Sequence, residues 1–304
     1  MMIKKIPKII QSPLRYPGGK SSFLKFFHEI MVSNRLVGKY YYEPFAGGAG
    51  VGLGLLSLGV AAEIFLNDAD YHIYSFWQAL LKHNQRFIDQ VEYVPLTIDE
   101  WSKQKEVYDN YKKHSCFDVG FSAFYLNRCN RSGIIVGAGP IGGKQQRGKW
   151  KLDARFNKQN LIKRIMNIQN LRKRIHISNN DAIRFLKTKL PQGDKRRDVL
   201  VYLDPPYVRV GSKLYLNFYE EKDHKNLAQY LISQKYLKWI VTYDDSELIR
   251  QLYLDSRKWI IQLNYSLQLK QKGKEILIVS KTTQIPDDTK NLYNKWNIKE
   301  EISV

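Results

Sequence analysis

Short apolar runs alternate with helix-like segments along most of the chain. Six of these runs have the length and composition of buried strands: 40–45, 62–66, 175–178, 199–203, 239–243 and 275–280. The apolar segment Val51–Leu58 and the mixed segment Asp223–Gln234 are typical of helices that connect strands. Because strands that alternate with helices usually pair in parallel, the pattern predicts an α/β fold with a largely parallel sheet.

Residues 71–156 follow a different pattern. The segments Trp77–Phe87 and Asp99–Lys113 predict helices, whereas 132–143 holds too many glycines for a helix or a regular strand. From Lys144 to Arg174 there are eleven lysines and arginines and a single acid, Asp153. We therefore divide the chain into three parts: a discontinuous domain (1–71 and 158–285), an inserted, mainly helical domain (72–157) and a C-terminal tail (286–304).

Composition narrows the class of protein. The 304 residues are 43% hydrophobic, enough for a large core, and 49 Lys+Arg against 29 Asp+Glu give a net charge of +20. Two cysteines exclude a disulfide framework, and six scattered histidines predict no metal site. No apolar run has the length of a signal-peptide core or a membrane span, so we expect a soluble, cytoplasmic protein with no membrane partner. The charge favours a polyanion, most simply nucleic acid.

The turn FAGGAG at 45–50 follows a predicted strand and opens a predicted helix. Glycines there, Gly47 and Gly48 among them, allow backbone N–H groups to approach a ligand closely at a helix N-terminus. Asp68 comes eighteen residues after Gly50, at the end of the next strand, where an acid accepts hydrogen bonds from ribose hydroxyls. No Lys-Ser/Thr pair follows the turn, which excludes a P-loop and leaves NAD and S-adenosylmethionine (SAM) open.

A second Pro/Gly turn, YPGGK at 16–20, precedes the first predicted helix. Its aromatic Tyr16 is a candidate contact for an adenosine or a sulfonium, and its Lys20 for a carboxylate.

The strand at 199–203 stops abruptly at Asp204, Pro205, Pro206 and Tyr207. The two prolines cannot extend the sheet and they fix φ, so this edge of the sheet presents one carboxylate, one directed carbonyl and one aromatic face. This trio suits an aromatic amine. Asp204 and the Pro205 carbonyl can accept the hydrogens of the amine, and Tyr207 can stack on a flipped base.

These elements, in this order, resemble the Dam-like DNA adenine methyltransferases over residues 14–281. YPGGK (16–20) is similar to the family's N-terminal motif, EPFAGGA (43–49) to its glycine motif, LND (66–68) to its strand-end acid and DPPY (204–207) to its catalytic tetrad. Segments similar to a branch of the family are YLNR (125–128), GPIGG (139–143), DARFN (153–157), SNND (178–181), DH (223–224), YDD (243–245), YS (265–266) and GKE (273–275). Two features depart from the family. Tyr16 stands where Trp is frequent, and the glycine motif is GGAG rather than GxG.

The resemblance implies a Rossmann-like, SAM-dependent methyltransferase sheet at 1–71 and 158–285, with a target-recognition domain inserted at 72–157. It also implies site-specific methylation of the exocyclic N6 amine of an adenine flipped out of double-stranded DNA, with 204–207 as the catalytic residues. The residues that it implies as SAM contacts are Tyr16, Lys20, Phe45, Gly47, Gly48, Asp68, Asp181 and Asp204.

The inserted domain and its basic flank supply the candidate DNA contacts. Arginine to guanine and asparagine to adenine are the natural pairings in the major groove, whereas the flanking charges suit phosphates. Candidates for base edges or for the strand near the flipped base are Asn127, Arg128, Asn130, Arg131 and Ser132; candidates for phosphates are Lys144, Arg147, Lys149, Lys151 and Arg155.

Two alternatives stay open on the residues themselves. The Asp-Pro-Pro-Tyr segment serves an amine on either base, so methylation of the cytosine N4 amine is a close rival. The second alternative is a DNA-binding component of a defence assembly in which turnover is dispensable. A restriction nuclease or another defence protein is a further candidate partner.

Overall fold

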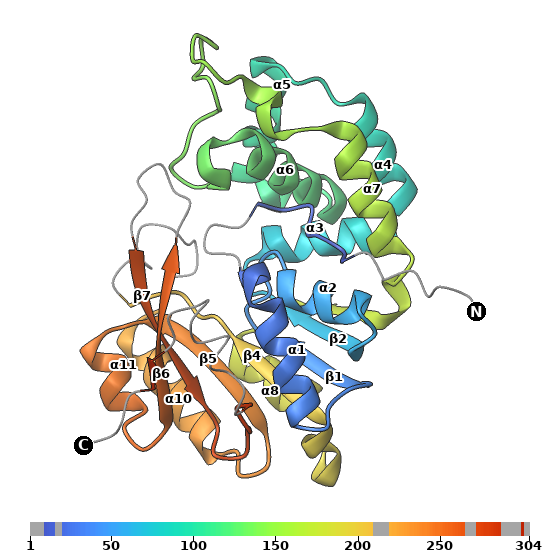
Figure 1. The fold of residues 1–304 in the computed structure, drawn as a ribbon. Coiled ribbons are helices and arrows are strands. Elements are labelled where there is room, and N and C mark those ends of the chain that lie inside the picture. The colour runs from blue at the N-terminus through green and yellow to red at the C-terminus, as the bar shows by residue number, and fades with distance from the viewer. Residues whose placement is uncertain (1–8, 16–19, 209–218, 265–271, 287–298, 301–304) are drawn as a thin grey trace.

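The structure is a computed structural model that describes residues 9–15, 20–208, 219–264, 272–286 and 299–300. In these residues the centre of the fold is one eight-stranded sheet in the order β3-β2-β1-β4-β5-β7-β6-β8 (Figure 1). The strands are β1 (Lys39–Glu43), β2 (Ala61–Asn67), β3 (Ile175–Ser178), β4 (Val199–Leu203), β5 (Lys238–Asp244), β6 (Arg257–Asn264), β7 (Lys272–Val279) and β8 (Lys299–Glu300). Strands β1 to β5 pair in parallel, which confirms the predicted α/β fold.

Helices cover both faces of this sheet, and β4 shows why its sequence is apolar throughout. All five β4 residues are buried, with Leu200 and Tyr202 in one hydrophobic cluster and Val199, Val201 and Leu203 in the other. A strand buried on both faces has no need of alternating polar positions. One cluster takes side chains from α1 (Leu24–Ser33) and α2 (Gly50–Ser57), and the other from α8 (Ala182–Lys189), α10 (Glu221–Ser233) and α11 (Glu247–Leu252).

The sheet differs from the prediction on the side formed by its last strands, β7, β6 and β8. Strand β7 runs antiparallel to β5, and β6, which the apolar runs did not predict, pairs antiparallel with β7. Strand β8 lies within the predicted tail 286–304 and pairs with β6, while 287–298 and 301–304 lie outside the described residues.

A helical unit is inserted between β2 and β3 and lies above the sheet in Figure 1. The predicted helix 77–87 is in fact two helices, because His83 leaves the helical region at φ −121° and ψ 43°. No helix of the described residues is long and apolar enough to cross a bilayer. The helices of the unit are α3 (Tyr71–Lys82), α4 (Asn84–Tyr93), α5 (Ile98–Asp109), α6 (Cys116–Cys129) and α7 (Lys158–Gln169).

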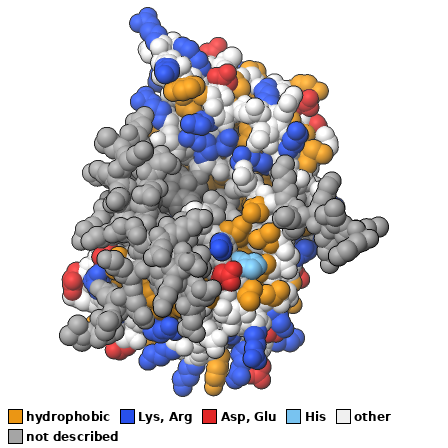
Figure 2. All heavy atoms as spheres, in the orientation of Figure 1, with side chains coloured by type: hydrophobic (Ala, Val, Ile, Leu, Met, Phe, Trp, Pro, Cys, Tyr) orange, Lys and Arg blue, Asp and Glu red, His pale blue; other side chains and the backbone are white. Residues whose placement is uncertain are grey.

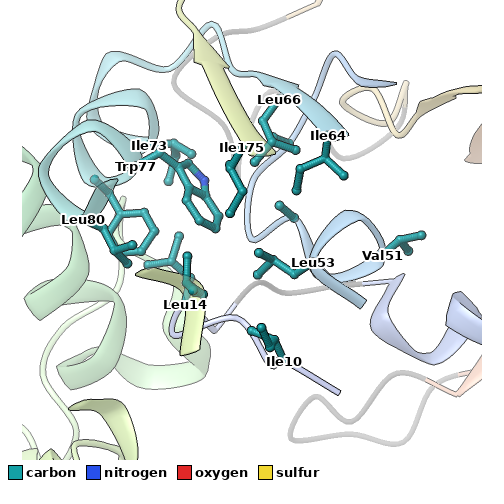
Figure 3. Packing of buried hydrophobic residues seen from close by; sticks show 14 of the residues in the cluster. Ile10, Leu14, Val51, Leu53, Ile64, Leu66, Ile73, Trp77, Leu80 and Ile175 are labelled. Atoms are coloured by element: carbon teal, nitrogen blue, oxygen red, sulfur yellow. The ribbon is translucent and has the colours of Figure 1, made fainter. Parts of the chain in front are cut away.

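The helical unit shares its core with one face of the sheet. Trp77 of α3 is fully buried and packs in the same cluster as Leu66 of β2, Ile175 of β3 and Leu53 of α2 (Figure 3). Leu14, from the N-terminal segment, belongs to this cluster too. The apolar contacts therefore continue from the sheet into the helices.

Helices α3 and α6 cross at a point where a side chain would not fit. A Cβ atom added to Gly120 of α6 would lie 2.3 Å from the backbone oxygen of Ser75 in α3. Glycine is thus required there by the approach of two backbones.

We predict that Gly120→Ala lowers the free energy of unfolding by about 1–3 kcal/mol, because the clash with a backbone carbonyl outweighs the helix propensity gained. Chemical denaturation measures the change. Gly139→Ala is the matched control, since the nearest atom to its added Cβ is the Arg131 guanidinium at 3.8 Å; we expect a change within about 0.5 kcal/mol. Equal stability of the two variants would contradict the packing argument.

Candidate active site

The carboxylate of Asp204 follows the last residue of β4 and is held from two sides. The Lys20 Nζ atom lies 3.0 Å from both Asp204 oxygens, and Thr242 of β5 donates to Asp204 Oδ1 at 2.8 Å. Tyr202 of β4 lies 2.9 Å from the Thr242 hydroxyl, which fixes that side chain in turn. The Asp204 side chain keeps 26% of its surface exposed, so this anchored carboxylate still faces solvent.

A second carboxylate, Glu275 of β7, completes this group. Its side chain is 1% exposed, its Oε1 atom lies 3.3 Å from Lys20 Nζ, and it accepts a hydrogen bond from the Tyr207 hydroxyl. The Tyr207 hydroxyl also lies 3.1 Å from Lys20 Nζ. Two carboxylates around one ammonium offset the cost of burying it.

Sequence reasoning did not name Glu275 or Thr242 as site residues. Glu275 carries a signal, since it is a charged residue at the start of the apolar run 275–279 and that run forms an inner strand. Thr242 lies in a predicted strand and carries no comparable signal, because a buried threonine is ordinary in β structure.

The glycine turn joins β1 to α2 with two residues in the left-handed region, Gly47 at φ 45° and Ala49 at φ 47°. Ala49, the departure from the GxG pattern, is the residue directly before α2 and adopts a conformation that favours glycine. Trp77 of α3 donates to the Gly47 carbonyl at 3.0 Å. The inserted helices therefore hold the turn in place.

Asp68, after the end of β2, closes the same turn. Its Oδ2 atom accepts from the Gly47 N–H at 2.9 Å and its Oδ1 from the Asp70 N–H at 3.0 Å. Burial, and secondly the charge of Asp70, raise the pKa of Asp68 to about 7, against the opposing effect of these hydrogen bonds. The structure thus brings the predicted glycine turn and the predicted acid into direct contact.

The other predicted cofactor residues lie in different settings. Asp181 is exposed and caps α8, accepting from the Ile183 N–H at 2.9 Å and the Arg184 N–H at 3.2 Å. Phe45 is partly exposed and packs edge-on against Tyr219, whose ring centre is 5.6 Å away. The charge of Asp181, after burial, raises the pKa of Tyr219. Gly48 is buried within the turn, and Tyr16 lies outside the described residues.

Two of the asparagines predicted as DNA contacts are buried instead. Asn127 is 2% exposed and bonds both the N–H and the carbonyl of Arg15 at 2.7 Å. Asn130 is fully buried, accepts from Trp101 at 2.7 Å and donates to the Ile134 carbonyl at 3.0 Å. Both amides are occupied in holding loops, so the structure does not bring them to a DNA surface.

Among the other predicted DNA contacts, Arg128 is 9% exposed and Ser132 is partly exposed with φ 56°. The remaining residues are exposed: Arg131, Lys144, Arg147, Lys149, Lys151 and Arg155. The loop that carries most of them is organised by Gln146, which donates to the Ile141 and Gly143 carbonyls at 2.7 Å. Figure 2 shows lysine and arginine side chains across the upper part of the visible face, where Figure 1 places the helical unit.

Comparison with known families shows to which family the chain belongs. A sequence model of the D12 class N6 adenine-specific DNA methyltransferases matches residues 16–267, which include the glycine turn, Asp68 and Asp204, whereas Glu275 lies beyond the matched residues. The chain belongs to this family. It is an adenine-specific DNA methyltransferase, and SAM is the methyl donor that the family implies. The resemblance to Dam-like enzymes is thereby confirmed.

A search of solved structures finds weak similarities. A Pyrococcus horikoshii structure, provisionally described as an RNA methyltransferase, has 12% identity, a TM-score of 0.40 and coverage of 90% of this chain and 89% of its own. The Escherichia coli protein yhhF, provisionally described as a methyltransferase, has 14% identity, a TM-score of 0.33 and coverage of 88% and 90%. No curated protein matches the sequence significantly.

A buried acid, Glu43 of β1, lies beneath the glycine turn and bonds the first turn of α2. Glu43 Oε1 accepts from the Gly52 N–H and the Tyr41 hydroxyl, each at 3.0 Å, and burial raises the pKa of Glu43 to about 8. The pKa of Glu43 is higher in the folded protein than in the unfolded chain. The stabilisation by Glu43 is therefore complete at a pH below the pKa of the unfolded chain, and it is lost as the pH rises toward 8.

We therefore predict that Glu43→Gln flattens the fall in melting temperature between about pH 5 and pH 8, since the amide mimics the protonated carboxyl. Thermal unfolding across this range tests it. Glu92→Gln, at an exposed position of α4, is the control and keeps the wild-type profile. An unchanged slope in Glu43→Gln would show that Glu43 does not titrate in this window.

Proposed function

We propose that this methyltransferase transfers the methyl group of SAM, at specific sites, to the N6 amine of an adenine flipped out of double-stranded DNA. The observation that carries the proposal is the Asp204 carboxylate. It is anchored by Lys20 and Thr242, remains partly exposed, and stands at the same sheet edge as the glycine turn and Asp68. In open α/β sheets this edge is where ligands bind.

The residues at this edge fit SAM. Asp68 is a partly exposed acid beside a glycine turn, which suits ribose hydroxyls, and Lys20 is an ammonium that suits a carboxylate. Phe45 is partly exposed beside Tyr219 and offers an aromatic face, and Asp181 acts electrostatically on the same tyrosine, which suits the adenine ring of the cofactor. We also keep as proposed SAM contacts the motif residues Gly47, Gly48 and Tyr16, because the motifs that contain them are similar to the cofactor motifs of the family. When bound, SAM supplies a methyl group made electrophilic by its sulfonium.

Asp204 and the Pro205 carbonyl would accept the two hydrogens of the adenine amine and so direct its lone pair. Tyr207 would stack on the base, and Pro206 would fix the chain between them. Catalysis by such positioning needs no covalent bond between enzyme and base. The bound cofactor would supply the methyl group to the amine nitrogen, and Asp204 would accept the proton that the methylated amine gives up.

Lys20 has to move for this to happen, because its Nζ atom occupies both oxygens of Asp204. We propose that Lys20 turns toward the cofactor carboxylate and thereby frees Asp204 for the amine. Glu275, which also contacts Lys20 and Tyr207, then keeps both side chains near the site. Productive binding of adenine would consequently follow binding of the cofactor.

DNA would approach the exposed basic residues of the helical unit and its loop. Arg131, Lys144, Arg147, Lys149, Lys151 and Arg155 are proposed as contacts to the DNA backbone. For Asn127 and Asn130 we propose instead that they position the loops that face DNA.

We predict that Asp204→Asn reduces methyl transfer at least about 100-fold while DNA affinity stays near the wild-type value, since the amide can donate where an acceptor is needed. The assay uses labelled SAM and mass spectrometry of the digested nucleosides. Asp194→Asn is the control, with a side chain 95% exposed. Transfer by Asp204→Asn at the wild-type rate would refute this mechanism, and N4-methylcytosine in place of N6-methyladenine would refute the substrate.

The raised pKa of Asp68 gives a separate prediction. An ionised Asp68 accepts hydroxyl hydrogen bonds better, so the affinity for SAM should rise between pH 6 and pH 8. In Asp68→Asn this contribution disappears, and the affinity at pH 8 falls toward the value at pH 6. Isothermal titration calorimetry measures both affinities. Because the wild type and Asp68→Asn are compared at the same pH, the titration of SAM itself affects both proteins equally. The same pH profile in both proteins would exclude Asp68 as the ribose contact.

A further inference from the structure

Two arginines from different helices contact the N-terminal segment 12–15, which itself contributes a third, Arg15. Arg164 of α7 donates to the Ser12 carbonyl at 3.0 Å, and Arg128 of α6 lies 3.4 Å from the Pro13 carbonyl. Arg15 itself donates to the Asn130 carbonyl at 3.3 Å. A fourth, Arg155, lies on the short 3-10 turn Leu152–Arg155 and acts electrostatically on both Arg15 and Arg128. We call Arg15, Arg128, Arg155 and Arg164 the arginine cluster.

No carboxylate of the described residues forms an ion pair with any member of the arginine cluster. Asp153 lies on the same turn as Arg155 and is exposed, yet it pairs with none of the four. Arg128 is more than nine-tenths buried, and its Nε atom has no hydrogen-bond partner. A buried guanidinium with a free donor is costly unless a ligand satisfies it.

The charges within the cluster also repel one another. Burial, and after it the charges of Arg15, Arg164 and Arg155, lower the pKa of Arg128 to about 10. Burial and Arg155 likewise lower the pKa of Arg15. Like charges gathered without a counterion destabilise the free protein, and an anion bound among them would remove that penalty.

The cluster is tied to the candidate active site by a short stretch of chain. Arg15 precedes Lys20 by five residues, so their Cα atoms lie within about 18 Å of each other. Asn127 fixes the Arg15 end of this stretch through both backbone groups of Arg15. The length of this stretch limits how far an anion held beside Arg15 can lie from the backbone of Lys20.

We propose that the arginine cluster binds a backbone phosphate of the DNA strand that carries the target adenine, within about five nucleotides of that base. This inference rests on the proposed function. The planar guanidinium fork matches phosphate oxygens in a bidentate manner, which favours a phosphodiester over a lone carboxylate. Lys144, Lys149 and Lys151, in the loop that precedes Arg155, are exposed and would extend these contacts along a backbone.

The test is a scan of binding to duplexes in which single phosphates are replaced by neutral methylphosphonates. The wild-type enzyme should lose about tenfold in affinity at one or two positions near the target adenine. Arg155→Gln and Arg164→Gln should bind unmodified DNA more weakly and lose the sensitivity at those positions, with the slope of log K against log[salt] reduced by about one. Lys225→Gln, at an exposed position of α10, is the control and keeps the wild-type scan.

The possible results separate the inference from the proposed function. If the variants show the wild-type scan and salt slope while the wild type methylates adenine, the cluster does not bind phosphate and the proposed function stands. If the wild type methylates no adenine, the proposed function fails. Arg155→Gln also reports on folding, because removal of one repelling charge should leave the melting temperature of the free protein unchanged or raised. A lower melting temperature would mean that Arg155 supports the fold, and would overturn its place in the cluster.

Discussion

The buried ammonium of Lys20 sets the geometry on which the site depends. Removing such a charge from water costs several kcal/mol unless anions surround it, and here the anions come from β4 and β7. These strands are separated by β5, and Asp204 follows the carboxyl end of β4. An acid near the start of β7 reaches that edge only because β7 runs antiparallel to β5, in a register that pairs Asp244 with Glu275. The antiparallel strand is therefore a condition of the site.

The inserted helices and the sheet are coupled by side chains as well as by apolar packing. Trp77 of α3 bonds the glycine turn, and Asn127 of α6 bonds the segment that leads to Lys20. Asn67, at the end of β2, bonds the Pro44 and Asn180 carbonyls and so joins three strand ends. The helices proposed to meet DNA thus fix two of the elements proposed to hold the cofactor. A displacement of α3 or α6 would be transmitted to both.

Some features of the fold and the site could be predicted from the sequence and others could not, for different physical reasons. The inner strands were predictable because burial on both faces demands the continuous apolar runs that β4 shows. Strand β6 was missed because Arg257 and Lys258 open it with charge. The contact between Gly47 and Asp68 followed from parallel strands ending at one edge, whereas Glu275 depended on the direction of β7, which no local pattern specifies. Asn127 and Asn130 were expected at the surface because polarity predicts exposure, and the loops they bond are visible only in three dimensions.

A polyanion has to approach a site lined by acids, and the structure limits the repulsion between them. Lys20 offsets one charge of the pair Asp204 and Glu275. Burial raises the pKa of Glu43 to about 8 and that of Asp68 to about 7, so near neutral pH these two carboxyls are largely or partly protonated. Four acids then carry much less than four negative charges. The positive excess of the whole chain, +20, can therefore attract DNA against a reduced negative field at the sheet edge.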